Sequence, residues 1–285
     1  NGYKNTDSAS NVSLSFTGSL GFTSGGSPSS ILNAGTYGYT PGTLAISSSN
    51  TNYLVVLASS LTNQYVVTPA TVSLSASKVY DGTVTFTAGT AGTSFTVTTG
   101  IGSQTLSVSG SSAANSSNVT GVSSLSTSGL TLLNGTGLAS NYVLPASTPN
   151  VVITPKSITA SLSNQTKVYD TNTVATLTAG SNSSDGSYVL SGFVGSEGAY
   201  ITQTVGSYNN ANVASASTVS ATIGSSFVAK GSTLLTNYVL PTTASTSSGG
   251  GTISPAPLTM TANDASTYVG VAPNLTYQLS GLLGG

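Results

Sequence analysis

The sequence predicts an all-β fold of tandem small β-sandwich (Ig-like) domains in an extended rod. Three observations predict it: segments in which apolar and hydroxyl residues alternate, no sustained helical spacing, and motifs that recur roughly every 90 residues. An alternation of period two places one set of side chains on a buried face and the other in solvent, as in a strand. An interval of this length is typical of a sandwich of about seven short strands.

Alternating segments occur along most of the chain, and each predicts a strand with one buried face. In order they are residues 71–76, 83–88, 94–98, 105–109, 157–162 and 257–262. Gly, Ser and Thr are poor helix formers, and 53 Ser, 45 Thr and 33 Gly are present. The hydrophobic fraction of 38% and the recurrent Val, Ile and Tyr oppose the alternative of a disordered stalk.

Three series of motifs divide the chain. They are Lys78-Val79-Tyr80-Asp81 with Lys167-Val168-Tyr169-Asp170, Asn141-Tyr142-Val143-Leu144-Pro145 with Asn237-Tyr238-Val239-Leu240-Pro241, and the prolines Pro69, Pro155 and Pro255. Each proline separates an apolar strand from the next alternating one. Because proline fixes φ and donates no hydrogen bond, we expect stiff joints there. The predicted units are 1–69, 70–155, 156–255 and 256–285, and we name 70–155 repeat 1 and 156–255 repeat 2.

The composition excludes several classes of function. Only 4% of the residues are charged, and His and Cys are absent, which removes the usual zinc, haem and iron–sulfur ligands and the Ser-His-Asp triad. Five lysines without arginine cannot form a nucleic-acid footprint. No apolar run approaches the about 18 residues of a membrane span. We therefore expect no enzyme, no cofactor and no membrane-spanning segment.

The motifs resemble a family. Lys78-Val79-Tyr80-Asp81-Gly82-Thr83, with Asn141-Tyr142-Val143-Leu144 and Val152-Ile153-Thr154-Pro155 after it, is similar to the YDG domain of large bacterial exoproteins related to filamentous haemagglutinin. Repeat 2 resembles the same domain but has Thr171 where Gly is expected, which allows a different turn. Residues 1–69 resemble the C-terminal part of the companion MBG-type domain, and residues 256–285 its N-terminal part.

The resemblance implies a secreted adhesin or extracellular fibre, at the surface of a Gram-negative bacterium and exported by two-partner secretion. Its role would be that of a stalk or cohesive element in attachment or biofilm. The absence of cysteine suits a chain that must stay unfolded through an oxidising periplasm. We expect self-association into a filament, lateral or head to tail, with residues 256–285 completed by residues 1–69 of the next copy. Because residues 1–69 and 256–285 resemble two parts of one domain, the chain could also be one period of a longer fibre.

No residue is assigned a catalytic, cofactor-binding or metal-binding role. The acids occur singly, which favours solvated loop or turn charges; they are Asp7, Asp81, Asp170, Asp185, Glu197 and Asp264. A calcium ion held by backbone carbonyls and one carboxylate stays open as an alternative, as does a glycosidase pair formed by Asp185 and Glu197.

Three further alternatives remain. Lys78 with Asn141, or Lys167 with Asn237, could form an isopeptide bond beside Asp81 or Asp170. The runner-up function is a glycan-binding β-sandwich module, because exposed tyrosines among hydroxyls can stack on sugars; the repeat tyrosines are instead expected in the core or at corners. They are Tyr80, Tyr142, Tyr169 and Tyr238. An ice-binding Thr array requires a flat sheet, which unequal twisted repeats do not offer.

Overall fold

The computed structural model describes residues 14–23, 32–47, 52–56, 64–181 and 185–283. Within these ranges every regular element is a strand, apart from two single-turn 3-10 helices, η1 (Ala139–Asn141) and η2 (Leu235–Asn237). The predicted all-β class is confirmed. Asp7 and Lys4 lie outside the described residues.

Three antiparallel strand pairs form the described part of the first 69 residues. They are β1 (Phe16–Thr17) with β5 (Ala45–Ile46), β2 (Gly21–Phe22) with β4 (Tyr39–Thr40), and β3 (Gly35–Tyr37) with β6 (Tyr65–Val67). The Phe22 ring is buried and stacks on Tyr65 with ring centroids 4.9 Å apart. This aromatic contact connects strands that belong to different pairs.

Repeat 1 contains ten strands. Phe86, Leu74, Leu125 and Ile153 are almost fully buried in it, and the alternating burial along Ser73–Val79 matches the predicted period of two. Its strands are β7 (Ala70–Thr71), β8 (Ser73–Val79), β9 (Thr85–Thr87), β10 (Thr93–Thr98), β11 (Leu106–Ala113), β12 (Leu125–Ser126), β13 (Leu130–Asn134), β14 (Tyr142–Val143), β15 (Ser147–Thr148) and β16 (Val151–Thr154).

The described part of repeat 2 contains twelve strands and a core that includes Ile201, Val219 and Ile223. Its largest sheet has the order β20-β23-β24-β27. The strands are β17 (Lys156–Ser157), β18 (Thr159–Leu162), β19 (Gln165–Val168), β20 (Val174–Thr176), β21 (Tyr188–Ser191), β22 (Ala199–Ile201), β23 (Val205–Tyr208), β24 (Val219–Thr222), β25 (Phe227–Ala229), β26 (Tyr238–Val239), β27 (Thr243–Ser245) and β28 (Gly251–Ser254).

The two repeats share their strand pairing. The short strand after each proline pairs in parallel with the strand that begins at the motif tyrosine: β7 with β14, and β17 with β26. The Tyr80 amide donates to the Thr154 carbonyl at 2.9 Å, and the Tyr169 amide donates to the Ser254 carbonyl at 2.8 Å. The recurring motifs therefore occupy equivalent positions in the two repeats.

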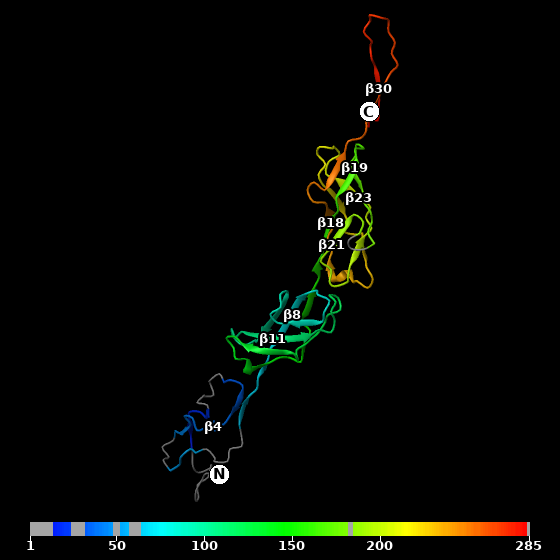
Figure 1. Ribbon diagram of the computed structural model, residues 1–285. Coiled ribbons are helices and arrows are strands. Elements are labelled where there is room, and N and C mark those ends of the chain that lie inside the picture. Colours follow the sequence, from blue (N-terminus) through cyan, green and yellow to red (C-terminus); the bar gives the residue numbers. More distant parts are fainter. Residues whose placement is uncertain (1–13, 24–31, 48–51, 57–63, 182–184, 284–285) are drawn as a thin grey trace. The chain divides into compact units, whose positions relative to one another are not determined.

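The chain divides into two compact units. Unit 1 comprises residues 1–77, 85–114 and 123–151; unit 2 comprises 78–84, 115–122 and 152–285. Two short segments of repeat 1 thus belong to the same unit as repeat 2. Unit 2 also contains a hairpin of β29 (Thr259–Ala262) and β30 (Tyr277–Ser280), which has no third strand beside it in the described chain (Figure 1).

The hairpin differs from the sequence expectation in one respect. A strand does form within residues 257–262, at Thr259–Ala262, but the predicted buried face is wrong, since every residue of β29 and β30 is exposed. The alternation in this segment predicts a buried face that needs a covering partner, and none covers it within the described residues.

Candidate functional site

Each repeat holds the ammonium group of its motif lysine in a cradle of oxygen atoms. Lys78 Nζ donates to Asp81 Oδ1 at 2.6 Å, to the Thr83 carbonyl at 2.7 Å and to Thr83 Oγ1 at 2.9 Å. Asp81 Oδ1 also accepts the Thr83 amide at 2.9 Å. The Lys78 side chain is only 1% exposed and that of Asp81 51%, so the buried charge has its counter-ion at the surface.

Repeat 2 builds the same cradle in a more exposed place. Lys167 Nζ donates to Asp170 Oδ1 at 2.6 Å and to the Asn172 carbonyl at 2.7 Å, and Asn172 Oδ1 replaces the Thr83 hydroxyl at 3.0 Å. The lysine side chain is 16% exposed here. The cradle fixes the turn between β8 and β9 and between β19 and β20.

The turn itself is the same in both repeats, although repeat 2 lacks the signature glycine. Gly82 has φ of 79° and Thr171 has φ of 69°, both in the left-handed region. The possible change of turn is therefore not observed. A β-branched residue in this conformation is strained. Lys167 binds both neighbours of Thr171, Asp170 and Asn172, and so holds the turn in place.

Thr171→Gly is expected to stabilise unit 2. Relief of the left-handed strain gains about 1–2 kcal/mol, and the greater flexibility of glycine in the unfolded chain offsets about 0.5–1 kcal/mol of it. A net gain of about 1 kcal/mol should appear in urea unfolding. Gly82→Thr, which introduces the same strain into repeat 1, should lower the free energy of unfolding; an unchanged value for both variants would contradict the assignment.

The second feature is a contact made by the motif asparagines. Asn237 is buried at the end of η2; its Oδ1 accepts the Val119 amide at 2.9 Å, and its Nδ2 donates to Asn118 Oδ1 at 2.9 Å. In unit 1 the Asn141 side chain makes the same pair of hydrogen bonds, with the Ala34 amide and with Asn33 Oδ1, both at 2.8 Å. We name this arrangement the asparagine clasp.

Beside the Asn237 clasp lies an aromatic cluster that surrounds one carboxylate. Tyr80 Oη donates to Glu197 Oε1 at 2.7 Å, and Tyr238 Oη donates to Glu197 Oε2. The rings of Tyr80 and Tyr238 meet edge to face at 5.3 Å, and Phe193 packs against Tyr238 at 4.9 Å. All four residues belong to unit 2, with Tyr80 contributed by the 78–84 segment.

This environment changes the acidity of the two tyrosines. Burial, followed by the hydrogen bond to Glu197, raises the pKa of Tyr80 to about 12. The same two causes, in the same order, raise the pKa of Tyr238 further. Both causes favour the protonated phenol, which can donate to the carboxylate.

The cluster should make unit 2 sensitive to alkali. A folded-state pKa above the unfolded value of about 10 means that the stabilisation is complete below pH 10 and is lost as pH rises toward 12. Absorbance of tyrosinate should show late ionisation of both phenols, and Glu197→Gln should shift it to lower pH. Tyr80→Phe and Tyr238→Phe assign the two steps. Ionisation of all tyrosines near pH 10 would contradict the cluster.

The two acids of the glycosidase hypothesis, Asp185 and Glu197, bind different groups in the structure. Asp185 accepts from Ser181, at 2.7 Å to its amide and 2.6 Å to its hydroxyl, whereas Glu197 binds two tyrosines, so these acids have separate surroundings. Among the described residues no three His, Cys, Asp or Glu side chains gather in a way that could hold a metal ion. Nor does this part of the chain contain a helix with the length and apolarity to cross a membrane.

The isopeptide hypothesis is disfavoured. The motif asparagines are engaged in the clasps, and each motif lysine is surrounded by carboxylate, carbonyl and side-chain oxygens. In each proposed pair the lysine nitrogen and the asparagine amide thus have different hydrogen-bond partners. Of the four motif tyrosines, Tyr80, Tyr142 and Tyr238 are buried as expected, while Tyr169 is only partly buried.

The sequence reasoning did not find the clasps. The motif asparagines end the 3-10 helices η1 and η2, and their side-chain partners are more than 100 residues away in the sequence. One signal was available: Asn-x-x-Asn-Val occurs at 115–119 and again at 209–213.

Comparison with known proteins identifies one part of the chain. Residues 62–150 match the YDG domain family, which covers both the lysine cradle of repeat 1 and Asn141. Neither the curated proteins nor the solved structures gave a match. The resemblance to the YDG domain is thus confirmed for this segment.

Proposed function

We propose that this chain is the structural repeat region of a secreted bacterial surface adhesin or extracellular fibre. In this role it acts as a stalk and cohesive element and performs no chemistry. Its repeats are tandem Ig-like sandwiches that follow one another as a stiff rod, between two parts of MBG-type domains. The YDG match and the all-β architecture support this assignment.

The observation that carries the proposal is the asparagine clasp. A structural spacer needs contacts that fix one module against the segment before it, and the chain makes this contact twice with the same side chain and the same two hydrogen bonds. In addition, two of the parallel strand pairs, β7 with β14 and β17 with β26, connect a proline-flanked linker to the strand of the motif tyrosine. These linkers are consequently paired with the module that follows them.

Low charge supports a cohesive role. With a net charge of −1 over 285 residues, copies repel one another weakly, and hydroxyl groups provide most of the solubility. Association should therefore depend little on salt. Exposed apolar side chains of the hairpin, Met260, Leu279 and Leu282 among them, offer surface for such contacts.

The proposal is tested by displaying the full chain on a non-adherent bacterium, with a Ser- and Gly-rich spacer of equal length as the control. We expect cells that carry the chain to aggregate and to attach to surfaces more than the control cells do, in low and in high salt. Behaviour equal to that of the control cells would refute the cohesive role. A glycan array with the purified chain tests the alternative, a glycan-binding module, which specific binding to a sugar would support.

A further inference from the structure

A linker strand follows each of three prolines in the chain. After the first two, the third residue of the linker is buried: Val72 is 3% exposed and Ile158 is 5% exposed. Each linker pairs in parallel with the strand that starts at the motif tyrosine. The Val72 amide donates to the Val143 carbonyl, and the Ile158 amide to the Val239 carbonyl, both at 3.0 Å.

The third linker has the same form but no such strand. Leu258 stands three residues after Pro255, as Val72 does after Pro69, yet it is 52% exposed. In the described chain no strand pairs with residues 256–258. In the other two linkers the amide of the third residue donates the hydrogen bond, and the equivalent residue here is Leu258. Pro257 lacks an N–H, but it precedes Leu258 and so leaves the Leu258 amide able to donate.

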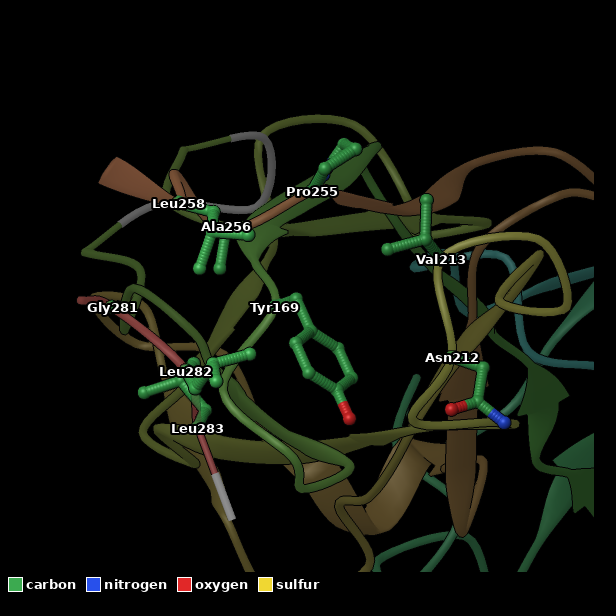
Figure 2. Close-up of a pocket in the computed structure, with 9 residues that line it drawn as sticks. All are labelled: Tyr169, Asn212, Val213, Pro255, Ala256, Leu258, Gly281, Leu282 and Leu283. Atoms are coloured by element: carbon green, nitrogen blue, oxygen red, sulfur yellow. The ribbon is translucent and has the colours of Figure 1, made fainter. Parts of the chain in front are cut away.

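A pocket of about 370 Å³ lies beside this third linker. Figure 2 shows the Tyr169 ring projecting into it, with Leu258 of the linker and Leu282, which follows β30, on one side and Asn212 and Val213 on the other. Tyr169 occupies in repeat 2 the place of Tyr80 in repeat 1. Tyr80 packs against the motif tyrosine Tyr238, and the linker strand at 156–157 pairs with the strand that begins there. Their equivalents, Tyr169 and the linker at 256–258, both line this pocket.

The loop at Asn212 matches the loop that receives Asn237. The Asn118 carbonyl accepts the Gly121 and Val122 amides, at 3.3 and 3.2 Å. The Asn212 carbonyl likewise accepts the Ser215 and Ala216 amides, at 3.1 and 2.9 Å. In the first loop the Asn118 side chain and the Val119 amide bind Asn237. In the second, the corresponding residues Asn212 and Val213 are exposed in the described structure.

One segment of the chain has the composition that this pocket requires. Asn52-Tyr53-Leu54 repeats the order asparagine, tyrosine, apolar residue of Asn141-Tyr142-Val143 and Asn237-Tyr238-Val239. Asn52 and Leu54 are exposed and Tyr53 is partly buried, whereas Tyr142 and Tyr238 are buried.

We propose that the pocket at Tyr169, Asn212 and Leu258 binds the Asn52–Tyr53–Leu54 segment of a second copy of this chain. Asn52 would form the third asparagine clasp with Asn212 and Val213. Tyr53 would fill the space beside Tyr169, and the 53–54 backbone would pair in parallel with the linker at 256–258. The contact is heterologous, so it joins copies head to tail without closing. This inference rests on the proposed structural function and specifies its partner and contact.

The test uses cross-linking, because the chain has no cysteine of its own. Full-length Asn52→Cys and Asn212→Cys are mixed under mild oxidation. We expect a disulfide-linked heterodimer that forms several-fold faster than in a mixture of Asn52→Cys with Thr90→Cys, which carries its thiol at an exposed position outside the pocket. Asn118→Cys/Asn237→Cys, which forms the equivalent bridge within one chain, calibrates the geometry.

Equal rates in the two mixtures would overturn the proposal, provided that the calibrating variant forms its bridge. A second measurement does not depend on disulfide geometry: Tyr53→Ala should reduce self-association in sedimentation while the circular dichroism spectrum stays unchanged. Undiminished association would equally overturn it. If cells that display the chain still aggregate while cross-linking fails, the cohesive function stands and only this contact is wrong.

Discussion

Asp81→Asn is expected to lower the free energy of unfolding by about 2–3 kcal/mol, because it removes the carboxylate that pairs with the buried Lys78 ammonium. Breaking one partner of a buried ion pair costs about 3–5 kcal/mol, and the half-exposed position of Asp81 reduces that value. Thr83 keeps two of its oxygen contacts with the lysine, which prevents complete loss of the turn. Urea unfolding of the full chain, with hydrogen exchange at residues 73–87 as a local readout, measures the effect.

Asp170→Asn is the matched control. It removes the same carboxylate charge from a cradle that is more exposed to solvent, so its effect should be clearly smaller. Equal losses for the two variants would show that burial of Lys78 does not determine the cost.

The effect of Asp81→Asn should also depend on pH. Burial raises the pKa of Asp81, but the hydrogen bonds from Lys78 and Thr83 and the lysine charge outweigh it and hold the pKa below its usual value. A lowered folded-state pKa stabilises the fold at pH values above the unfolded pKa of about 4, and that contribution disappears as pH falls through the folded-state value. The difference between the wild type and Asp81→Asn should therefore shrink below about pH 4. A difference that stays constant there would contradict the ion pair.

Asn237→Ala should destabilise unit 2 by about 2 kcal/mol. The side chain is 1% exposed and makes two hydrogen bonds, and its removal leaves the Val119 amide and the Asn118 side chain without this partner. Hydrogen exchange at residues 115–122 should become faster, since this loop loses its clasp. Urea unfolding measures the global effect.

Asn141→Ala serves as the comparison for Asn237→Ala. It breaks the equivalent clasp on Asn33 and Ala34, but this asparagine is only partly buried, so water can replace the lost hydrogen bonds. A smaller loss is expected, and it should leave exchange at 115–122 unchanged. Faster exchange in that loop in both variants would argue against a local clasp.

The strands could be predicted from the sequence because their signal is local. Alternation of apolar and hydroxyl residues over residues 71–76 and 157–162 corresponds to β8 and β18, whose burial alternates in the same way. The buried tyrosines follow from the same reasoning. The turn at Thr171 could not be predicted, because its φ is imposed by the lysine cradle and the paired strands, and not by the residue itself.

The clasps and the carboxylate cluster could not be predicted for a different reason. Tyr80 and Glu197 are 117 residues apart and Asn118 and Asn237 are 119 apart, so their meeting depends on how segments 78–84 and 115–122 pack in unit 2. Sequence periodicity fixes which residues repeat but not which distant residues they touch. Once the contact of Asn237 with Asn118 and Val119 is known, however, the recurrence of Asn-Val at 212–213 shows where the equivalent loop of repeat 2 lies.

Electron microscopy of the purified full chain at increasing protein concentration tests the central claim most directly, namely that this chain is an assembling structural element. The account predicts thin filaments that lengthen with concentration and are shortened by Tyr53→Ala. Separate particles with the mass of one chain at every concentration would contradict it.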